Sequence, residues 1–409
     1  MDPVTSVSSF TRAFARALQD RDEKSTCCEA TATSCDATSA STSALNPTWP
    51  GSPATAATPH LWPGQGHMLE ERKAPMDQER DSATVTNGFV PVIDLSGRHS
   101  AHGRAVLARA IGEACARSGF FTIVGHGVPH RLVDRMHTTT NAFFRLPDVA
   151  KELVASGPEV SGFRSSGGTT AQSLDQQSPP DLCEAFGIHV TGDLSASERA
   201  DLGDYWAPWK LVNAWPSVPA EFTATWREYM SAMTELCADL VRLFALALDL
   251  EEGFFDDRFD RHVSSLTANY YFPQLRRPRP GQLRRGPHTD FGALTVLYQE
   301  DDLTGLQVHT GAGRWRDVPA VPGSFVVNIG DLMAHWSGGC WVSTLHQVIN
   351  PESGDTSSRL SIPFFYQPNH DAPTDPVRPL GTPHEAQPHG TTAGEWIATK
   401  MLKLFAPPS

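Results

Sequence analysis

A series of short apolar runs in the C-terminal half of the chain restricts the folds that are open to it. From about residue 265 the runs read LTANYYF, ALTVLYQ, GLQVHT, RWRDV, SFVVNIG, WVSTLHQVI and RLSIPFFYQ. Each is rich in β-branched or aromatic residues and is separated from the next by Gly, Pro or Asn. Runs of this length and spacing predict an all-β sandwich or barrel.

The part of the chain before these runs predicts helices together with a few strands. FVPVIDLSG (89–97) is predicted to form an apolar strand. Residues 103–119 carry apolar residues at helical spacing, and the glycine at the end of this segment is suited to terminate the helix. FFTIVGHGVP (120–129) indicates a buried strand, and a long helix is expected around 220–250. Without alternating strands and helices or a phosphate-binding glycine motif, a nucleotide-binding sheet is disfavoured.

We expect these parts to form one domain over residues 86–400. Residues 86–255 supply the helices and first strands, and residues 260–370 form the β core. The predicted fold class is α+β with a mainly β core and flanking N-terminal helices.

Residues 1–85 differ from the rest in composition. Residues 25–59 are rich in Ser, Thr, Ala and Pro, with few large apolar residues and no period. Such a segment cannot bury enough surface to offset the entropy of ordering it, so we expect a disordered extension. Before it, residues 8–19 could form a short amphipathic helix, and a transit peptide is an alternative that the acidic residues after it disfavour.

Charge and cysteine content limit the partners and the setting. The formal net charge of −13 disfavours nucleic acid or an anionic membrane as the main partner. We interpret the arginines of residues 274–285 as a solvated loop beside the pocket. No apolar run reaches the roughly 18 residues of a membrane span. The seven cysteines are odd in number and irregularly spaced, which favours a reducing, cytoplasmic setting. The sequence gives no indication of the oligomeric state.

His288 and Asp290 lie two residues apart at the start of an apolar run. In an extended chain such residues point to the same face, and His346 lies in a later β run. Sixteen histidines make a single His-x-Asp pair uninformative. Two imidazoles and one carboxylate on β strands nevertheless match the facial triad of non-haem Fe(II) enzymes. A structural zinc site usually has four ligands with thiolates; no cysteine is close in sequence, but the spacing leaves Cys340 open as a ligand.

A carboxylate anchor follows on the next predicted strand. Arg359 offers a planar guanidinium that binds a carboxylate with two hydrogen bonds, and Ser361 faces the same way and adds a hydroxyl. A keto acid with a distal carboxylate could therefore bind the metal at one end and Arg359 at the other.

With these residues the sequence resembles the isopenicillin N synthase-like branch of the Fe(II)/2-oxoglutarate-dependent dioxygenases. The matching stretches are PVIDL (91–95), GFFTIVGHGVP (119–129), NAWP (213–216), NYYFP (269–273), HTDFGALTVL (288–297), GLQV (305–308), VPGSFVVNIGDLM (321–333), STLHQV (343–348) and RLSIPFF (359–365). The resemblance spans roughly residues 89–370 in the same order.

The resemblance implies a double-stranded β-helix, or jelly-roll, core. It assigns the iron ligands to His288, Asp290 and His346. It assigns the distal carboxylate of 2-oxoglutarate to Arg359, Ser361 and Tyr271, and contacts at the metal end to Asn269. It also implies O₂ as co-substrate and ascorbate as a possible reductant.

Some features depart from the family or bear on the substrate. The departures are the tripeptides His346-Gln347-Val348 and Ser337-Gly338-Gly339, and Cys183 in place of a usual Lys. These could alter the rim of the pocket. The candidates for its wall are Phe364 and Phe365, which could equally belong to the core, and Phe163, which could lie on a lid.

Five further residues are predicted to have structural roles. We interpret His126 and His309 as hydrogen-bonded strand or turn residues, and Trp315, Trp336 and Trp341 as core or pocket wall.

The implied reaction hydroxylates a small organic metabolite, as in secondary metabolism, while 2-oxoglutarate and O₂ give succinate and CO₂. Desaturation or ring formation requires only a different substrate pose. Three alternatives stay open: an iron-dependent oxidase of the same fold that does not use 2-oxoglutarate, a hydroxylase of proteins or nucleic acids, and a non-catalytic binding module. The last would be expected to lose a triad residue, yet all three are present.

Overall fold

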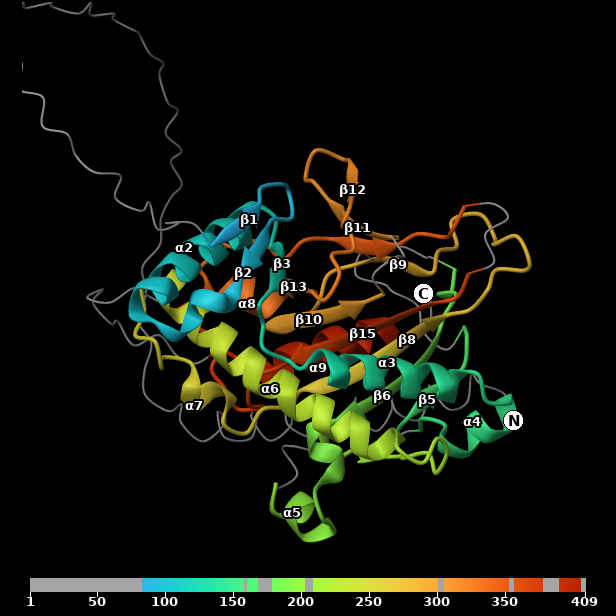
Figure 1. The fold of residues 1–409 in the computed structure, drawn as a ribbon. Coiled ribbons are helices and arrows are strands. Elements are labelled where there is room, and N and C mark those ends of the chain that lie inside the picture. The colour runs from blue at the N-terminus through green and yellow to red at the C-terminus, as the bar shows by residue number, and fades with distance from the viewer. Residues whose placement is uncertain are drawn as a thin grey trace, which may run out of the picture. The chain divides into compact units, whose positions relative to one another are not determined.

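The fold is seen in a computed structural model (Figure 1). The residues it describes are 83–157, 160–167, 179–202, 209–300, 305–352, 357–377 and 390–405. The extension predicted for residues 1–85 and its short helix lie outside these ranges, except that strand β1 (Thr84–Thr86) begins within the predicted extension.

The largest sheet has nine strands in the order β1-β2-β3-β13-β10-β15-β8-β6-β5. Neighbouring strands are antiparallel except β2 and β3, which are parallel. After β1 its strands are β2 (Val92–Asp94), β3 (Phe120–Val124), β5 (Phe163–Arg164), β6 (Glu184–His189), β8 (Ser265–Tyr271), β10 (Leu294–Gln299), β13 (Phe325–Ile329) and β15 (Arg359–Tyr366).

A four-stranded sheet in the order β12-β11-β14-β9 packs against the middle strands of the larger one (Figure 1). Its strands are β9 (Arg285–His288), β11 (Leu306–His309), β12 (Trp315–Asp317) and β14 (His346–Val348). Between the sheets, Phe120 and Tyr271 of the larger sheet join Val308 and Val348 of the smaller in one buried cluster. A separate short pair consists of β4 (Val160–Ser161) and β7 (Val212–Asn213). The two facing sheets form the jelly roll, which confirms the predicted fold class.

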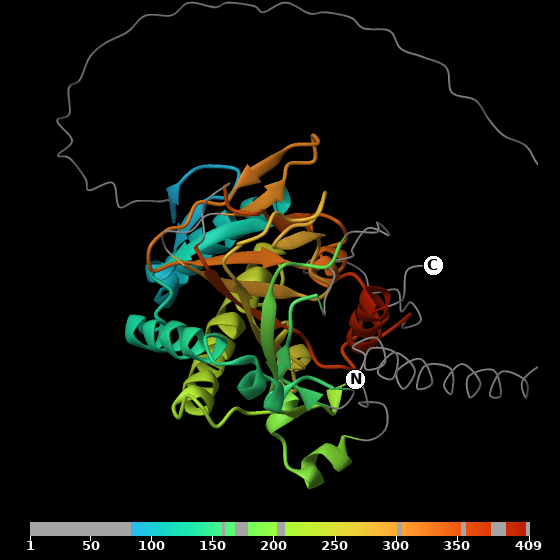
Figure 2. The ribbon, with the colours of Figure 1, turned by 90° about the vertical axis from the view of Figure 1, so that its right-hand side faces the viewer.

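Helices cover the other face of the nine-stranded sheet. The longest are α2 (Ala101–Arg117), α3 (His130–Phe144) and α6 (Phe222–Ala247). In both views α3 and α6 run along this face (Figures 1 and 2). Phe244 of α6 packs edge-on against Phe121 of β3, with ring centroids 6.5 Å apart. The apolar stripe of α6 therefore buries against the sheet and forms the main core.

The remaining helices are short, apart from a helix at the C-terminus. They are η1 (Leu95–His99), α4 (Asp148–Lys151), η2 (Glu152–Val154), η3 (Val190–Asp193), α5 (Ala196–Asp201), α7 (Asp256–Phe259), α8 (Asp331–Trp336) and α9 (Ala393–Phe405). None of the helices within the described ranges is long and apolar enough to span a membrane.

The helices predicted for 103–119 and around 220–250 correspond to α2 and α6. Gly119 follows α2 with a φ of +66°, and a Cβ there would lie 2.0 Å from the carbonyl oxygen of Val342. Only glycine fits this turn. The sequence did not predict that β3 would pair with β13 and so join the N-terminal part to the jelly-roll sheet.

Candidate metal centre

Two histidines face each other on neighbouring strands of the four-stranded sheet. β9 and β14 pair antiparallel with His288 directly opposite His346. The centroids of their rings are 4.2 Å apart. Directly opposed residues point to the same face of a sheet, so the strand register brings the two imidazoles together.

Asp290 completes a group of three potential ligands. One ligand atom from each of His288, Asp290 and His346 lies within 4.8 Å of the others. Oδ2 of Asp290 accepts hydrogen bonds from Oγ1 of Thr295 at 2.6 Å and from Nδ2 of Asn328 at 2.7 Å. Its Oδ1 lies 3.9 Å from Nε2 of His346. One carboxylate oxygen is therefore held by neighbours, while the other faces the histidines.

Backbone carbonyls determine which ring nitrogen of each histidine is free. Nδ1 of His288 lies 2.8 Å from the carbonyl oxygen of Gly286, and Nδ1 of His346 lies 3.1 Å from that of Thr344. A carbonyl can only accept a hydrogen bond, so the proton is assigned to Nδ1 in both rings. The lone pair on each Nε2 is then available to a metal.

The protonation states of the site suit metal binding. Burial lowers the pKa of His288 well below its ordinary value, and the nearby charges of His346 and Arg285 lower it further. Burial by itself would raise the pKa of Asp290, but the two imidazoles and the hydrogen bonds from Thr295 and Asn328 more than offset this effect, and its pKa is lowered. A neutral imidazole and an ionised carboxylate are the forms that ligate metals.

The donor set fits ferrous iron better than structural zinc. Two imidazole nitrogens and one carboxylate oxygen leave three positions of an octahedron open. None of the cysteines in the described ranges joins the group, and this includes Cys340, whose side chain is exposed. The described residues therefore do not form a zinc site with thiolate ligands at this position.

Arg359 lies on the inner face of β15, with 1% of its surface exposed. Its Nη2 donates to Oε1 of Gln299 at 3.2 Å. Its Nε and Nη1 are buried and have no hydrogen-bond partner among the described residues. Burying a guanidinium whose N–H donors have no partner costs folding free energy, and a bound anion would offset this cost. This side chain is therefore suited to bind an anion.

Tyr271, Asn269 and Ser361 lie on the same face of the sheet as Arg359. In the pairing of β8 with β15, Tyr271 lies opposite Arg359 and Asn269 lies opposite Ser361. Cζ of Arg359 lies 5.3 Å from the centroid of the Tyr271 ring. The structure thus brings the four residues predicted to bind 2-oxoglutarate onto one face of two adjacent strands.

The three phenylalanines predicted for the substrate wall do not lie together. Phe364 and Phe163 are buried in the core on the helix side of the sheet, where Phe163 packs edge-on against Phe143. Side chains alternate along a strand, so Phe364 points away from the face that carries Arg359. Phe365 points to that face and lies opposite Thr295 of β10.

Thr295 and Asn328, which hold Asp290, were not identified from the sequence. Neither belongs to the candidate ligand group, and Asn328 becomes a neighbour of Asp290 only because β13 pairs with β10 beside the metal centre. For Asn328 the available signal was a polar residue inside the otherwise apolar run FVVNIG.

The interpretation of the arginine cluster as a solvated loop needs correction. Arg276 and Arg277 are exposed as expected, but Arg284 is buried. Nη1 of Arg285 lies 3.3 Å from Oδ2 of Asp181. The end of this cluster is therefore drawn into the protein beside the metal centre, because it leads directly into β9.

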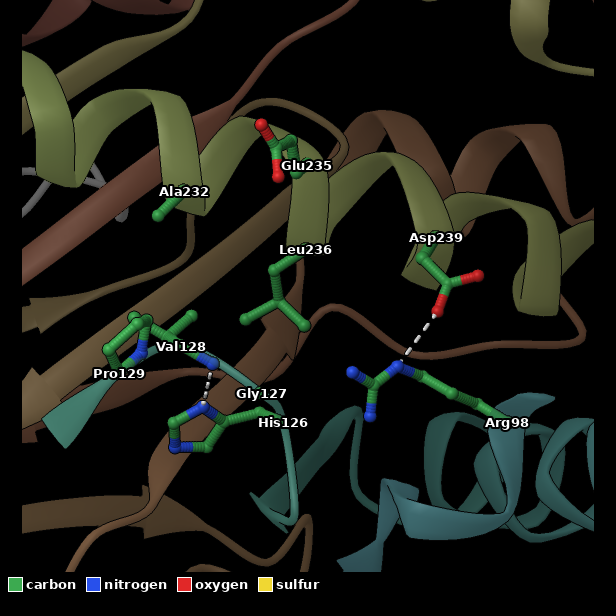
Figure 3. Close-up of a pocket in the computed structure, with 9 residues that line it drawn as sticks. All are labelled: Arg98, His126, Gly127, Val128, Pro129, Ala232, Glu235, Leu236 and Asp239. Atoms are coloured by element: carbon green, nitrogen blue, oxygen red, sulfur yellow. Dashed lines mark hydrogen bonds and ion pairs between the residues drawn. The ribbon is translucent and has the colours of Figure 1, made fainter.

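His126 lies away from the metal centre and lines a separate hollow of about 200 Å³ (Figure 3). Its Nδ1 accepts from the backbone N–H of Val128 at 3.1 Å, and its Nε2 lies 3.1 Å from the carbonyl oxygen of Gly323. Arg98 and Asp239 across the hollow form an ion pair at 3.5 Å. Both ring nitrogens of His126 are used, which confirms its structural role.

The other aromatic residues singled out from the sequence are mostly structural. Trp336 and Trp341 are buried in the main core, as expected. His309 and Trp315 lie opposite each other on β11 and β12, with ring centroids 5.2 Å apart.

Comparison with known proteins agrees with this geometry. Residues 90–218 match the family described as the N-terminal region of the non-haem dioxygenase in morphine synthesis. Residues 263–368 match the 2OG-Fe(II) oxygenase superfamily. Validamycin A dioxygenase of Streptomyces hygroscopicus subsp. limoneus is 33% identical over 78% of this chain and 87% of its own length.

Two solved structures share the fold. A full-length Neurospora crassa protein, in complex with α-KG and 5-formyluracil, has a TM-score of 0.64 and 25% identity over 77% of this chain and 96% of its own. JOX2, in complex with 2OG, Fe and JA, has a TM-score of 0.60 and 28% identity over 78% of this chain and 86% of its own. Sequence relatives and fold agree with the donor set of the site: the chain belongs to the Fe(II)/2-oxoglutarate-dependent dioxygenases.

Proposed function

We propose that His288, Asp290 and His346 bind the Fe(II) of this dioxygenase. The support is their donor chemistry, their mutual distances within 4.8 Å and the free Nε2 of each imidazole. Thr295 and Asn328 keep the carboxylate of Asp290 in one orientation, so the site is organised before the metal arrives. An octahedral ion held by these three residues would have three further positions for the keto acid and O₂.

Arg359 is the anchor for the distal carboxylate of 2-oxoglutarate. The observation that carries this assignment is the pair of buried donors Nε and Nη1, which lack a partner among the described residues and lie on the inner face of the jelly roll. Ser361 and Tyr271 contribute hydroxyl groups beside it, and Asn269 is the contact toward the metal end. A planar guanidinium and a carboxylate form two parallel hydrogen bonds, which also orient the keto acid.

The substrate is a small organic metabolite, and hydroxylation is the proposed outcome. The relatives named above point this way, since their names or complexes involve validamycin A, 5-formyluracil and JA. An Fe(II) held by His288, Asp290 and His346 would supply the oxidising chemistry for hydroxylating a C–H bond, with 2-oxoglutarate and O₂ consumed and succinate and CO₂ released. Phe365 is the proposed apolar wall that this chain supplies. The free, mostly buried cysteines among the described residues are in keeping with a cytoplasmic setting.

The substitution Arg359→Lys tests the anchor. It keeps the positive charge but loses the two-pronged geometry, and one charged hydrogen bond contributes roughly 1.5–3 kcal/mol. We expect the concentration of 2-oxoglutarate at half-saturation to rise on the order of tenfold to a hundredfold. Iron content should stay unchanged, because Arg359 is not a ligand.

The measurement is succinate formation at fixed iron, for wild type beside the variant. An unchanged half-saturation would remove Arg359 from the site. Oxidised product formed by wild type without 2-oxoglutarate would instead support the alternative oxidase.

A further inference from the structure

A second guanidinium shares the face of the sheet that carries the 2-oxoglutarate anchor. Arg164 of β5 lies opposite Ala185 of β6, which in turn lies opposite Asn269 of β8. Directly opposed side chains share a face, so Arg164 points to the same side as Asn269. Adjacent strands are about 4.8 Å apart, which places the Cα atoms of these two residues roughly 10 Å apart.

Arg164 has no counter-ion among the residues that the structure describes. Its Nε is buried without a hydrogen-bond partner, and no described carboxylate forms an ion pair with it. Burial, and then the positive charge of Arg285, lower the pKa of Arg164. Arg285 is already paired with Asp181, so Arg164 is the guanidinium of this pair that lacks an anion within the described ranges. Such a group is costly unless a ligand completes it.

The guanidinium of Arg164 packs over a glycine of the neighbouring strand. Gly187 on β6 has no side chain, and a Cβ there would lie 3.6 Å from Nη2 and 3.7 Å from Nη1 of Arg164. The guanidinium therefore lies over bare backbone. His189, two residues further on the same face, has a buried Nδ1 without a partner among the described residues.

His189 can add a neutral hydrogen bond to the same ligand. Burial, and then the charge of Arg164, lower its pKa to about 4. The ring is therefore uncharged near neutral pH and can donate one N–H without adding charge. The site combines one permanent cation with one neutral donor.

We propose that Arg164 and His189 bind the carboxylate of the substrate, which is therefore a small organic acid. The inference rests on the proposed function, in which Arg359 takes the distal carboxylate of 2-oxoglutarate and leaves Arg164 for the substrate. A planar guanidinium matches a carboxylate. In this proposal each of the two acids has its own guanidinium partner, although the chain as a whole carries a formal net charge of −13.

The test measures binding to the protein loaded with Mn(II) and 2-oxoglutarate under nitrogen, so that the metal and Arg359 are already occupied. The probes are benzoate, phenylacetate and hexanoate, each beside its carboxamide, which has nearly the same shape and no charge. Calorimetry gives the affinity of each. We expect at least one acid to bind wild type about tenfold to a hundredfold more tightly than its amide.

Two variants locate the effect. Arg164→Gln should remove the preference for the acid, and Gly187→Asp should do the same by placing a carboxylate beside the guanidinium. If one of these variants fails to fold, the other still tests whether Arg164 causes the preference for the acid. Arg276→Gln is the matched control, because Arg276 is an exposed arginine between β8 and β9. This variant should keep the preference for the acid.

The proposal is overturned if no acid is preferred by wild type, or if the preference survives in a folded Arg164→Gln or Gly187→Asp variant. Titration of 2-oxoglutarate in the same samples tests the proposed function separately. Failure of 2-oxoglutarate to bind would overturn that function, whereas normal binding without acid preference would overturn only the role of Arg164.

Discussion

At the scale of single residues, the site depends on groups that hold the ligands as much as on the ligands. The carbonyl oxygens of Gly286 and Thr344 select the tautomer of each histidine. Asn328 and Thr295 both donate to the same oxygen of Asp290, which leaves its other oxygen directed at the histidines. Hydrogen bonds of this kind remove the freedom of a ligand to turn away, so they contribute to metal affinity.

Asn328→Ala should therefore weaken metal binding although Asn328 is not a proposed ligand. Loss of a partner of this kind typically costs on the order of tenfold to a hundredfold in metal affinity. The measurement is the dissociation constant for Mn(II) or anaerobic Fe(II) by calorimetry. Thr295→Ser keeps the hydroxyl donor and is the control expected to bind metal nearly as well as wild type. Equal affinities for Asn328→Ala and wild type would show that Asp290 needs no such support.

At the scale of elements, strand β15 serves two layers at once. Arg359 and Ser361 on one face line the inner side of the jelly roll, while Leu360 and Phe364 on the other are buried against the helix-side core. The alternation of an extended chain makes this division unavoidable. A change of one position along β15 therefore moves a mutation from the core to the site.

Adjacent phenylalanines on β15 test this division. Phe364 is fully buried in the main core, and truncating such a side chain to Ala costs about 3–5 kcal/mol. Phe364→Ala should lower the free energy of unfolding by this amount, measured by urea denaturation. Phe365→Ala is the matched variant, since Phe365 is half-buried on the inner face. It should lower the free energy of unfolding by well under half as much as Phe364→Ala, and its main effect should be on substrate-dependent turnover. Equal losses of stability would contradict the assignment of the two faces.

At the scale of the whole molecule, the family matches begin at residue 90 and together run to residue 368. Both sheets and all the proposed ligands lie between residues 84 and 366. The composition of residues 1–80 gives no reason to expect a contribution to this core.

Deleting residues 1–80 should therefore leave catalysis unchanged. We expect the rate of succinate formation and the half-saturation for 2-oxoglutarate to stay within about twofold of the full chain, a change of less than about 0.5 kcal/mol. The two proteins are compared at equal iron content. A truncated protein that folds and binds iron but has lost turnover would overturn this prediction.

The partly buried His262 should make the whole molecule sensitive to acid. Burial lowers the pKa of His262 to about 4, whereas in the unfolded chain it is near 6.5. Below pH 6.5 the unfolded chain binds a proton that the folded chain does not. The stabilisation is therefore complete above pH 6.5 and is lost as the pH falls toward 4, by about 2–3 kcal/mol.

His262→Gln should flatten this part of the pH profile, measured as the free energy of unfolding in urea at pH 7, 5.5 and 4.5. His99→Gln at an exposed position is the control. The same slope in wild type and His262→Gln would assign the acid sensitivity to other groups.

The amino-acid sequence by itself determined the fold class, the two long helices and the family. These follow from local properties: periodicity sets the type of each element, and the motif around His288 requires only short spacings along the chain. The same information proposed a ligand set and a carboxylate anchor, because imidazole, carboxylate and guanidinium chemistry allow few other combinations.

Only the tertiary structure decided which face of each strand is the inner one. Alternation shows that Phe364 and Phe365 point in opposite directions, but the order of strands and the packing of α6 decide which of them meets the core. The support of Asp290 by Asn328, and the lack of a counter-ion for Arg164 among the described residues, depend on contacts between strands that are distant along the chain. Such contacts leave no local signal in the sequence, since a polar residue in a strand can be assigned a role only when its neighbours on the adjacent strands are known.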